Sequence, residues 1–98
     1  MPYIPAKDRP NYDSLVQELA KKVPADNTLR CGHLNYIITT LVVATLKEQG
    51  LLNSTDSNYR YYLHNEVQGI LKCAADEFYR RLSAPYEDIK RDTEGDVY

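Results

Sequence analysis

Arg80 and Arg81 are the side chains in this sequence best suited to recognise an anion, because a guanidinium presents its N–H donors in a rigid fork. At about 100° per residue, Arg81 falls on the apolar face of a predicted helix, and Glu77 lies one turn earlier. A charge on an apolar face needs a partner, a route to solvent or a ligand. An ion pair with Glu77 and an anionic-ligand pocket both remain open. Since Arg80 points about 100° away from Arg81, the spacing predicts that the two do not form one fork.

Tyrosine supplies nine of the ten aromatic residues, and three of these cluster at 59, 61 and 62. A tyrosine combines a large apolar ring with a hydroxyl, which suits interfaces and half-wet pockets. An alternative of similar weight is that these rings only cover the ends of a small core. The predicted ligand-binding side chains are Arg81, Arg80, Arg60, Tyr62 and Tyr79.

Two cysteines and two histidines could in principle complete a tetrahedral zinc site. Cys31 and His33 have one residue between them, fewer than paired zinc ligands usually have. His64 and Cys73 are nine residues apart, which places them on opposite sides of a helix. We therefore predict no metal and no cofactor. Without a nucleophile motif or a phosphate-binding loop, we also predict that the protein is not an enzyme.

The length and net charge of the chain further narrow the classes of protein to which it can belong. The 98 residues fit a single domain, 1–98, and the net charge of −2 makes a nucleic-acid partner an unfavoured choice. No uninterrupted apolar run approaches the length of a membrane span, and the N-terminus lacks the pattern of a secretory signal. We expect a soluble cytoplasmic protein with free thiols and no membrane association.

The apolar spacing predicts an all-α protein, a compact bundle of about three helices. The first helix begins near Asp8 to Pro10 and ends at Pro24, a loop follows to Gly32, and the second helix covers Leu34 to Gln49 with Gly50 as its cap. The third helix carries an apolar face from Leu63 to Leu82, and it ends at Ala84-Pro85. Residues 51–58 form a polar linker, residues 1–9 an extended arm and residues 86–98 an acidic tail with little structure. Such a small core favours a homo-oligomer.

Several segments resemble a small uncharacterised family of bacteriophage and bacterial proteins. They are the opening Met1-Pro2-Tyr3-Ile4-Pro5, the Gly32-x-Leu34-Asn35-Tyr36 segment, Asn65 with Gly69, Tyr79-Arg80-Arg81 followed by Pro85-Tyr86-Glu87-Asp88 and Lys90, and the closing Gly95-Asp96-Val97-Tyr98. His33 replaces an acidic residue, Glu94 replaces Asn, and the 51–58 loop is longer than usual. The resemblance implies a compact helical protein of phage origin, in the host cytoplasm if phage-encoded. It assigns no role to any residue.

Two functions from different classes follow from these observations. The first is a non-enzymatic binding protein that captures a small anionic ligand, such as a signalling nucleotide, between subunits. The alternative is a protein–protein interaction module that antagonises or adapts a host protein.

Overall fold

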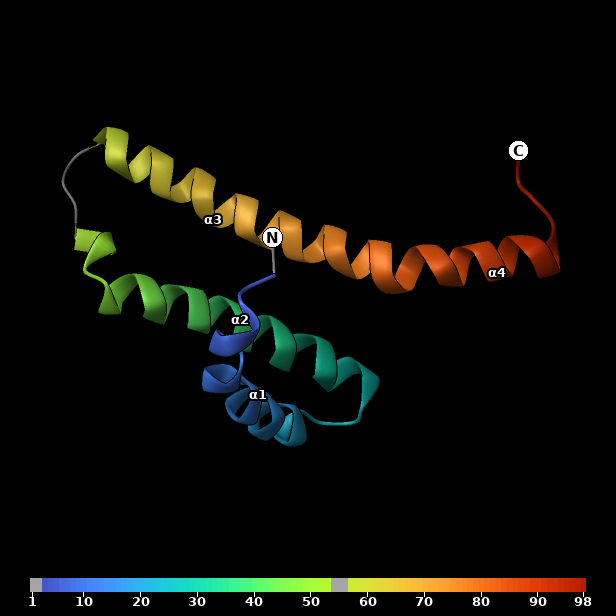
Figure 1. Ribbon diagram of the computed structural model, residues 1–98, viewed down its shortest axis with the longest axis horizontal. Helices are drawn as coiled ribbons and strands as arrows, with labels where there is room; N and C mark the ends of the chain where they lie inside the picture. Colours follow the sequence, from blue (N-terminus) through green and yellow to red (C-terminus); the bar gives the residue numbers. More distant parts are fainter. Residues whose placement is uncertain (1–2, 54–56) are drawn as a thin grey trace. The chain divides into compact units, whose positions relative to one another are not determined.

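The computed structural model describes residues 3–53 and 57–98, and within these ranges it contains helices and no strand (Figure 1). The predicted all-α class is therefore confirmed. The described chain divides into two units, one of residues Ile4–His64 and one that combines Tyr3 with Asn65–Tyr98. The single compact bundle stays a prediction.

The unit of residues 4–64 begins with a single 3-10 turn, η1 (Ala6–Asp8), followed by α1 (Pro10–Lys22). The turn corrects the prediction of an arm extended over residues 1–9: the Asp8 N–H donates to the Pro5 carbonyl at 2.9 Å, and so closes the chain locally. The start of α1 is confirmed, with Pro10 in the first turn, where its missing N–H costs no hydrogen bond.

The second helix, α2 (Asn27–Glu48), begins seven residues before the predicted Leu34, inside the segment expected to be a loop. The cause is Asp26, whose carboxylate accepts from the Thr28 and Leu29 amides at 2.9 and 3.1 Å. An aspartate in this position satisfies two donors that the first helical turn leaves free. The predicted cap at the other end is confirmed, since Gly50 has a φ of 71° and its N–H donates to the Lys47 carbonyl.

Among the residues described, α2 is also the one helix long and apolar enough, by length and composition, to cross a membrane. The core helix of a soluble protein meets the same criterion. The expected absence of a membrane, which depended on uninterrupted apolar runs, therefore stays a prediction.

A further 3-10 turn, η2 (Leu51–Asn53), contacts α2, and α3 (Ser57–Phe78) follows. The rest of the predicted polar linker, residues 54–56, lies outside the described residues. Leu63, near the start of α3, is the single buried apolar residue of the described chain. Most apolar side chains of the described residues therefore stay exposed within their own unit.

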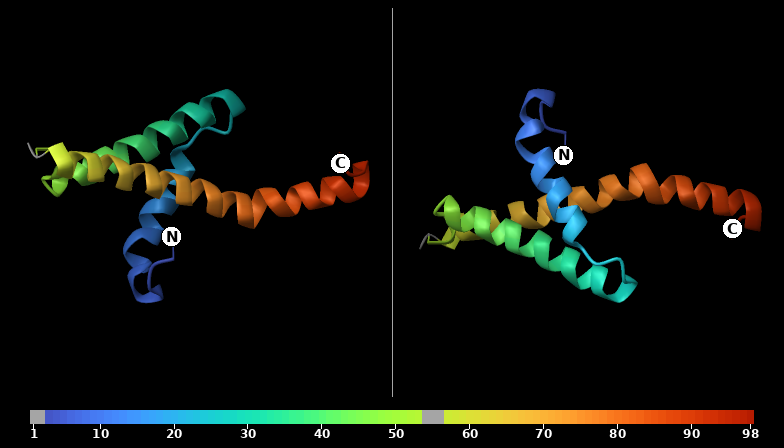
Figure 2. Two further views of the ribbon diagram at one scale, coloured as in Figure 1. Left: turned by 90° about the horizontal axis from the view of Figure 1, so that it is seen from above. Right: turned by 90° about the horizontal axis from the view of Figure 1, so that it is seen from below.

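In the second unit, α3 does not end at Ala84-Pro85 as predicted. It passes through a π-helical turn, η3 (Tyr79–Ser83), into α4 (Ala84–Glu94), and both views of Figure 2 show the helix changing direction near this turn. The predicted unstructured tail is thus wrong for all but the last four residues. The Ala84 N–H donates to the Tyr79 carbonyl, five residues back. We attribute the passage of Pro85 to this wider turn, because a proline ring clashes with the carbonyl of a normal turn.

Ion pairs along α4 help to explain why an acidic segment is helical. Lys90 and Glu94 pair at 3.8 Å with four-residue spacing, and Arg91 pairs with Asp88 at 3.8 Å. Such exposed pairs are individually weak but favour a helix. Gly95, at a φ of 91°, then ends the helix where a side chain would be strained.

Candidate functional site

The hydroxyl of Tyr3 is held by three charged side chains of the same unit. Arg80 Nη2 and Arg81 Nη1 donate to Tyr3 Oη at 2.7 and 3.1 Å, and this hydroxyl in turn donates to Glu77 Oε1. We call Tyr3, Glu77, Arg80 and Arg81 the arginine cluster. It joins the N-terminal segment to the junction of α3 and η3.

Glu77 is the carboxylate at the centre of the cluster. Its side chain is 21% exposed, against 63% and 60% for Arg80 and Arg81. Arg80 Nη2 lies 2.7 Å and Arg81 Nη1 3.8 Å from Glu77 Oε1. The Arg80 hydrogen bond, and after it the Tyr3 hydrogen bond, lower the pKa of Glu77, and Glu77 in turn raises the pKa of Arg80. Two guanidinium groups face one carboxylate, which leaves one positive charge in excess.

The prediction that Arg80 and Arg81 do not form one fork is wrong. Both guanidinium groups reach the same two oxygen atoms, Tyr3 Oη and Glu77 Oε1. The reason is that long, flexible side chains can bend back over one turn, although their Cα atoms diverge. The Arg81–Glu77 ion pair exists, but it is the longer of the two contacts to Glu77.

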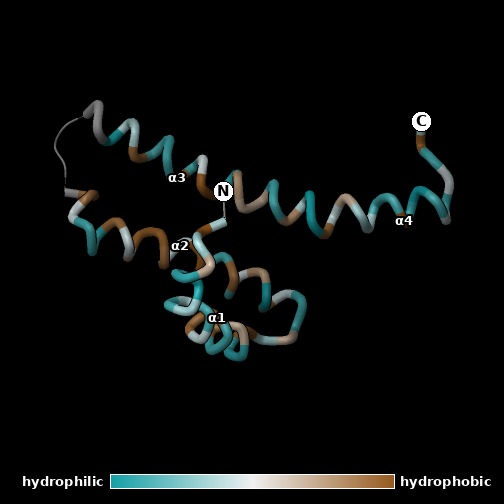
Figure 3. The backbone as a smooth tube through the Cα atoms, viewed as in Figure 1, coloured by the Kyte–Doolittle hydropathy of each residue, from teal (hydrophilic) through white to brown (hydrophobic). Residues whose placement is uncertain are grey.

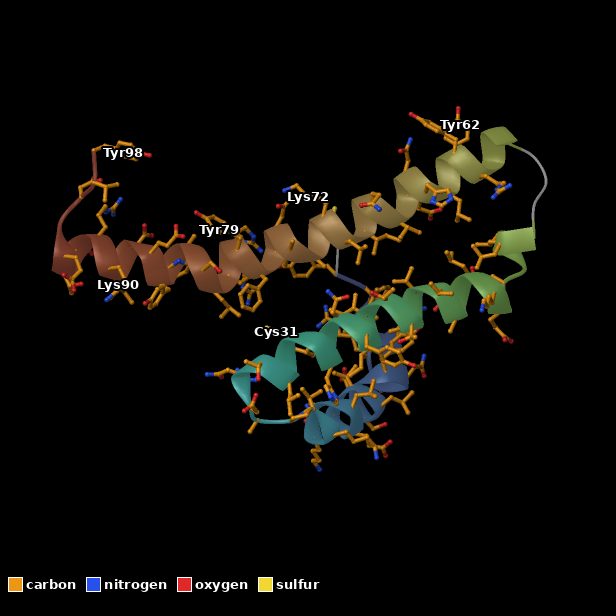
Figure 4. The ribbon with its side chains drawn as sticks, turned by 180° about the vertical axis from the view of Figure 1, so that it is seen from behind. Cys31, Tyr62, Lys72, Tyr79, Lys90 and Tyr98 are labelled. Atoms are coloured by element: carbon orange, nitrogen blue, oxygen red, sulfur yellow. The ribbon has the colours of Figure 1, made fainter. Side chains whose placement is uncertain are left out.

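Tyr79, the predicted tyrosine of this unit, does not join the cluster. Its hydroxyl donates to Glu87 Oε2 at 2.9 Å, and this bond raises the pKa of Tyr79. Figure 4 shows Tyr79 pointing to the same side of the helix as Lys72, one heptad earlier. The bond spans eight residues, and it ties η3 to α4.

An open hollow of about 430 Å³ lies beside this bond, lined by Phe78, Leu82, Ser83, Tyr86 and Glu87. The large apolar residues among these are spaced by four, and together with Ile89 they are 59–62% exposed. We call Phe78, Leu82, Tyr86 and Ile89 the apolar stripe. In Figure 3 the tube of α4 is largely hydrophilic, with short hydrophobic segments between.

The remaining predicted residues, Arg60 and Tyr62, belong to the other unit. Tyr62 packs edge to face against Tyr61, with ring centroids 6.2 Å apart, so the two rings form no flat stacking platform. The side chain of Tyr59 lies outside the described residues. Whether Arg60 and Tyr62 share a site with the arginine cluster stays a prediction.

Two further hollows were not predicted. One, of about 590 Å³, lies along α2 beside Gly32 and Tyr36. The other, of about 560 Å³, lies between α4 and the C-terminal residues Gly95–Tyr98. In residues 3–53 and 57–98, no group of three or more His, Cys, Asp or Glu side chains is arranged to hold a metal ion.

Tyr3 is the cluster residue that sequence reasoning missed. Its contact with Glu77 spans 74 positions, and no periodic pattern reports such a contact. A weak signal was present, since Tyr3 and Ile4 stand between two prolines in an otherwise polar arm. Apolar residues in such an arm suggest that it is bound to something.

Comparison with known proteins gives one match. A protein-family model described as "Domain of unknown function (DUF6899)" matches residues 1–97. No curated protein and no solved structure matches the chain. Because the family description states no activity, function must be argued from the geometry described above.

Proposed function

The chain belongs to the DUF6899 family, and for this member we propose a non-enzymatic binding protein that captures a small anionic ligand, such as a signalling nucleotide, between subunits. A bacteriophage origin and a place in the host cytoplasm are part of the proposal. The observation that carries it is the arginine cluster, in which two guanidinium groups converge on one phenolic oxygen.

The chemistry of the cluster suits phosphate groups. Arginine binds phosphate through parallel N–H donors, and Arg80 already presents both Nε and Nη2 to the Glu77 carboxylate. Tyr3 Oη occupies a point where both arginines can donate to one oxygen. A phosphate oxygen that takes the place of Tyr3 Oη would receive the same two hydrogen bonds. Its negative charge would balance the positive charge that is in excess in the cluster.

A screen of cyclic and linear nucleotides by thermal shift tests the proposal. We expect at least one nucleotide to raise the melting temperature of the native protein, and we expect Arg81→Ala to abolish that rise. Lys90→Ala is the matched control: it also removes one exposed positive charge, but one paired with Glu94 on α4. A screen without any stabilisation, or an equal loss in both variants, would contradict the proposal.

The exposed apolar stripe favours a second candidate, a module that binds and antagonises or adapts a host protein. An apolar helix face without a cover is typical of a surface that another helix occupies. This candidate predicts that a photo-crosslinker in place of Ile89 captures one dominant host protein, and that one in place of Asp92 does not. Capture of the same chain alone would contradict it.

A further inference from the structure

The described parts of its own unit leave the apolar stripe uncovered. Apart from the helix that carries it, the described part of this unit consists of Tyr3, which is bound in the arginine cluster, and the short C-terminal segment. The four side chains of the stripe keep about 60% of their surface exposed. A run of exposed apolar side chains on neighbouring turns of one helix is typical of a surface that associates with a partner.

We propose that a second copy of the chain covers the apolar stripe, with its helix antiparallel and the two-fold axis at Leu82, and that the arginine clusters of both copies then form one anion site. This inference rests on the proposed function for the ligand, whereas the pairing itself rests on the stripe alone.

The stripe has the symmetry that such a pairing needs. In a two-fold interface the same patch must fit itself, so a residue before the axis meets one after it. Phe78 and Tyr86 lie four residues on either side of Leu82, and each ring therefore meets the other ring of the second copy. Seven residues from the axis, Ile89 meets the small Ala75. Large against small at facing positions is the pattern of interdigitating helices.

The area is sufficient for a stable pair. Two more apolar residues of the same helix are exposed, namely Ile70 and Leu71 at 54% and 37%. If the four stripe residues and Ile70 each lose about 100 Å² and Leu71 loses about 70 Å², the pair buries about 1,100 Å². Stable protein interfaces begin at about that size.

The position of the cluster beside the stripe determines what the pairing brings together. Glu77 and Arg81 each precede a stripe residue, whereas Ser83 and Glu87 each follow one and line the hollow. At about 100° per residue, the two sets lie on opposite flanks of the stripe. In an antiparallel pair the two-fold axis is perpendicular to both helices, so a given flank of one helix and the same flank of the other lie on one side of the pair. Both clusters therefore lie on one side of the pair, and both Arg81 residues stand next to the axis.

Two Arg81 residues so placed are about 3 Å apart along the helix axis, with the helices about 8–10 Å apart. Like charges at this separation oppose the pairing unless an anion lies between them. A ligand with at least two negative charges, such as a cyclic dinucleotide or pyrophosphate, would accept bonds from both copies. The site is thus complete only in the pair, and ligand binding and pairing must strengthen each other by the same factor.

Cysteine crosslinking tests the pairing and its direction. In a Cys31→Ser/Cys73→Ser background, which removes the two exposed native thiols, we expect Leu82→Cys to crosslink to itself. Phe78→Cys mixed with Tyr86→Cys should crosslink at least tenfold faster than Phe78→Cys alone, and Asp88→Cys serves as the control. Faster crosslinking of Phe78→Cys with itself indicates a parallel pair and overturns the proposal. So does a monomer at 100 µM by sedimentation.

Sedimentation with pyrophosphate or a cyclic dinucleotide separates the two claims. We expect either probe to tighten the pairing of the native chain at least tenfold, and to leave that of Arg81→Ala unchanged. If the chain pairs antiparallel but no anion affects the pairing, the shared anion site fails and the pairing stands. If an anion binds a chain that stays monomeric, the pairing and the capture between subunits both fail, and anion binding by the arginine cluster alone stands.

Discussion

Pro24 and Pro85 each follow a helix with a clear apolar pattern, yet the chain responds to them in opposite ways. Before Pro24, α1 ends and Val23 is extended, with a ψ of 129°. Before Pro85, Ala84 stays helical, with a φ of −62° and a ψ of −46°. The usual rule, that the residue before a proline leaves the helical region, holds at the first site and fails at the second.

The neighbours of each proline explain the difference. Two residues after Pro24, Asp26 offers a carboxylate that starts a new helix. Near Pro85 no such break occurs, because the Ala84 N–H reaches back five residues to the Tyr79 carbonyl and widens the turn. The comparison teaches that a proline ends a helix where the chain has another way to satisfy its backbone groups. Otherwise the helix can widen and continue.

Of the changes near the two prolines, removal of Ser83 should have the largest effect, because it removes the wide turn before Pro85. With one residue fewer the π turn would close as a normal turn, in which the ring of Pro85 clashes with the carbonyl one turn earlier, so the helix breaks there. Tyr86 and Ile89, beyond the break, would no longer continue the apolar stripe, and we expect pairing at least tenfold weaker by sedimentation. Removal of Asp92 is the control, since it shifts only the last turn of α4. Equal pairing of the Ser83 deletion and the native chain would contradict this account of η3.

Acidification should release Tyr3 from the arginine cluster, which lies just before Pro85. The pKa of Glu77 is lowered in the folded chain, so its bonds stabilise the cluster above the ordinary value of 4.5 and are lost as the pH falls through the lower folded value. The ring signals of isotope-labelled Tyr3 in NMR should follow that transition. Glu77→Gln should abolish the transition and Glu94→Gln should leave it in place. An unchanged Tyr3 titration in Glu77→Gln would show that another group controls the contact.

Asp26→Ala should have the smallest and most local effect, at the start of α2 just after Pro24. The amides of Thr28 and Leu29 lose their acceptor, and their hydrogen exchange should become about fivefold faster. Exchange at Ala84 should not change. The control Asp13→Ala removes a first-turn acid of α1 and should leave both amides as they were. Protection of Thr28 that survives Asp26→Ala would mean that the start of α2 is held by other contacts.

The sequence was sufficient for features that repeat along one helix. Apolar spacing predicted three helices, the start of α1 at Pro10 and the end of α2 at Gly50. It also drew attention to Arg81 and its pairing with Glu77. Each of these depends on residues within a few turns of one another, where periodicity and capping chemistry decide the outcome.

Other features depend on competition or distance. The start of α2 was missed because Asp26 lies in a polar segment that resembles a loop until its two amide bonds are seen. The passage through Pro85 was missed because no residue type marks a π turn. Tyr3 was missed because its partners follow more than 70 residues later. Predicting that contact would require knowledge of which arm residue the arginines select.

The stoichiometry of ligand binding tests the central claim most directly. Titration calorimetry should use the nucleotide that stabilises the native chain most strongly in the thermal-shift screen. If the arginine clusters of two copies share one site, one ligand binds per two chains, and Arg81→Ala removes the binding heat. One ligand per chain, or unchanged binding heat in Arg81→Ala, would contradict the account.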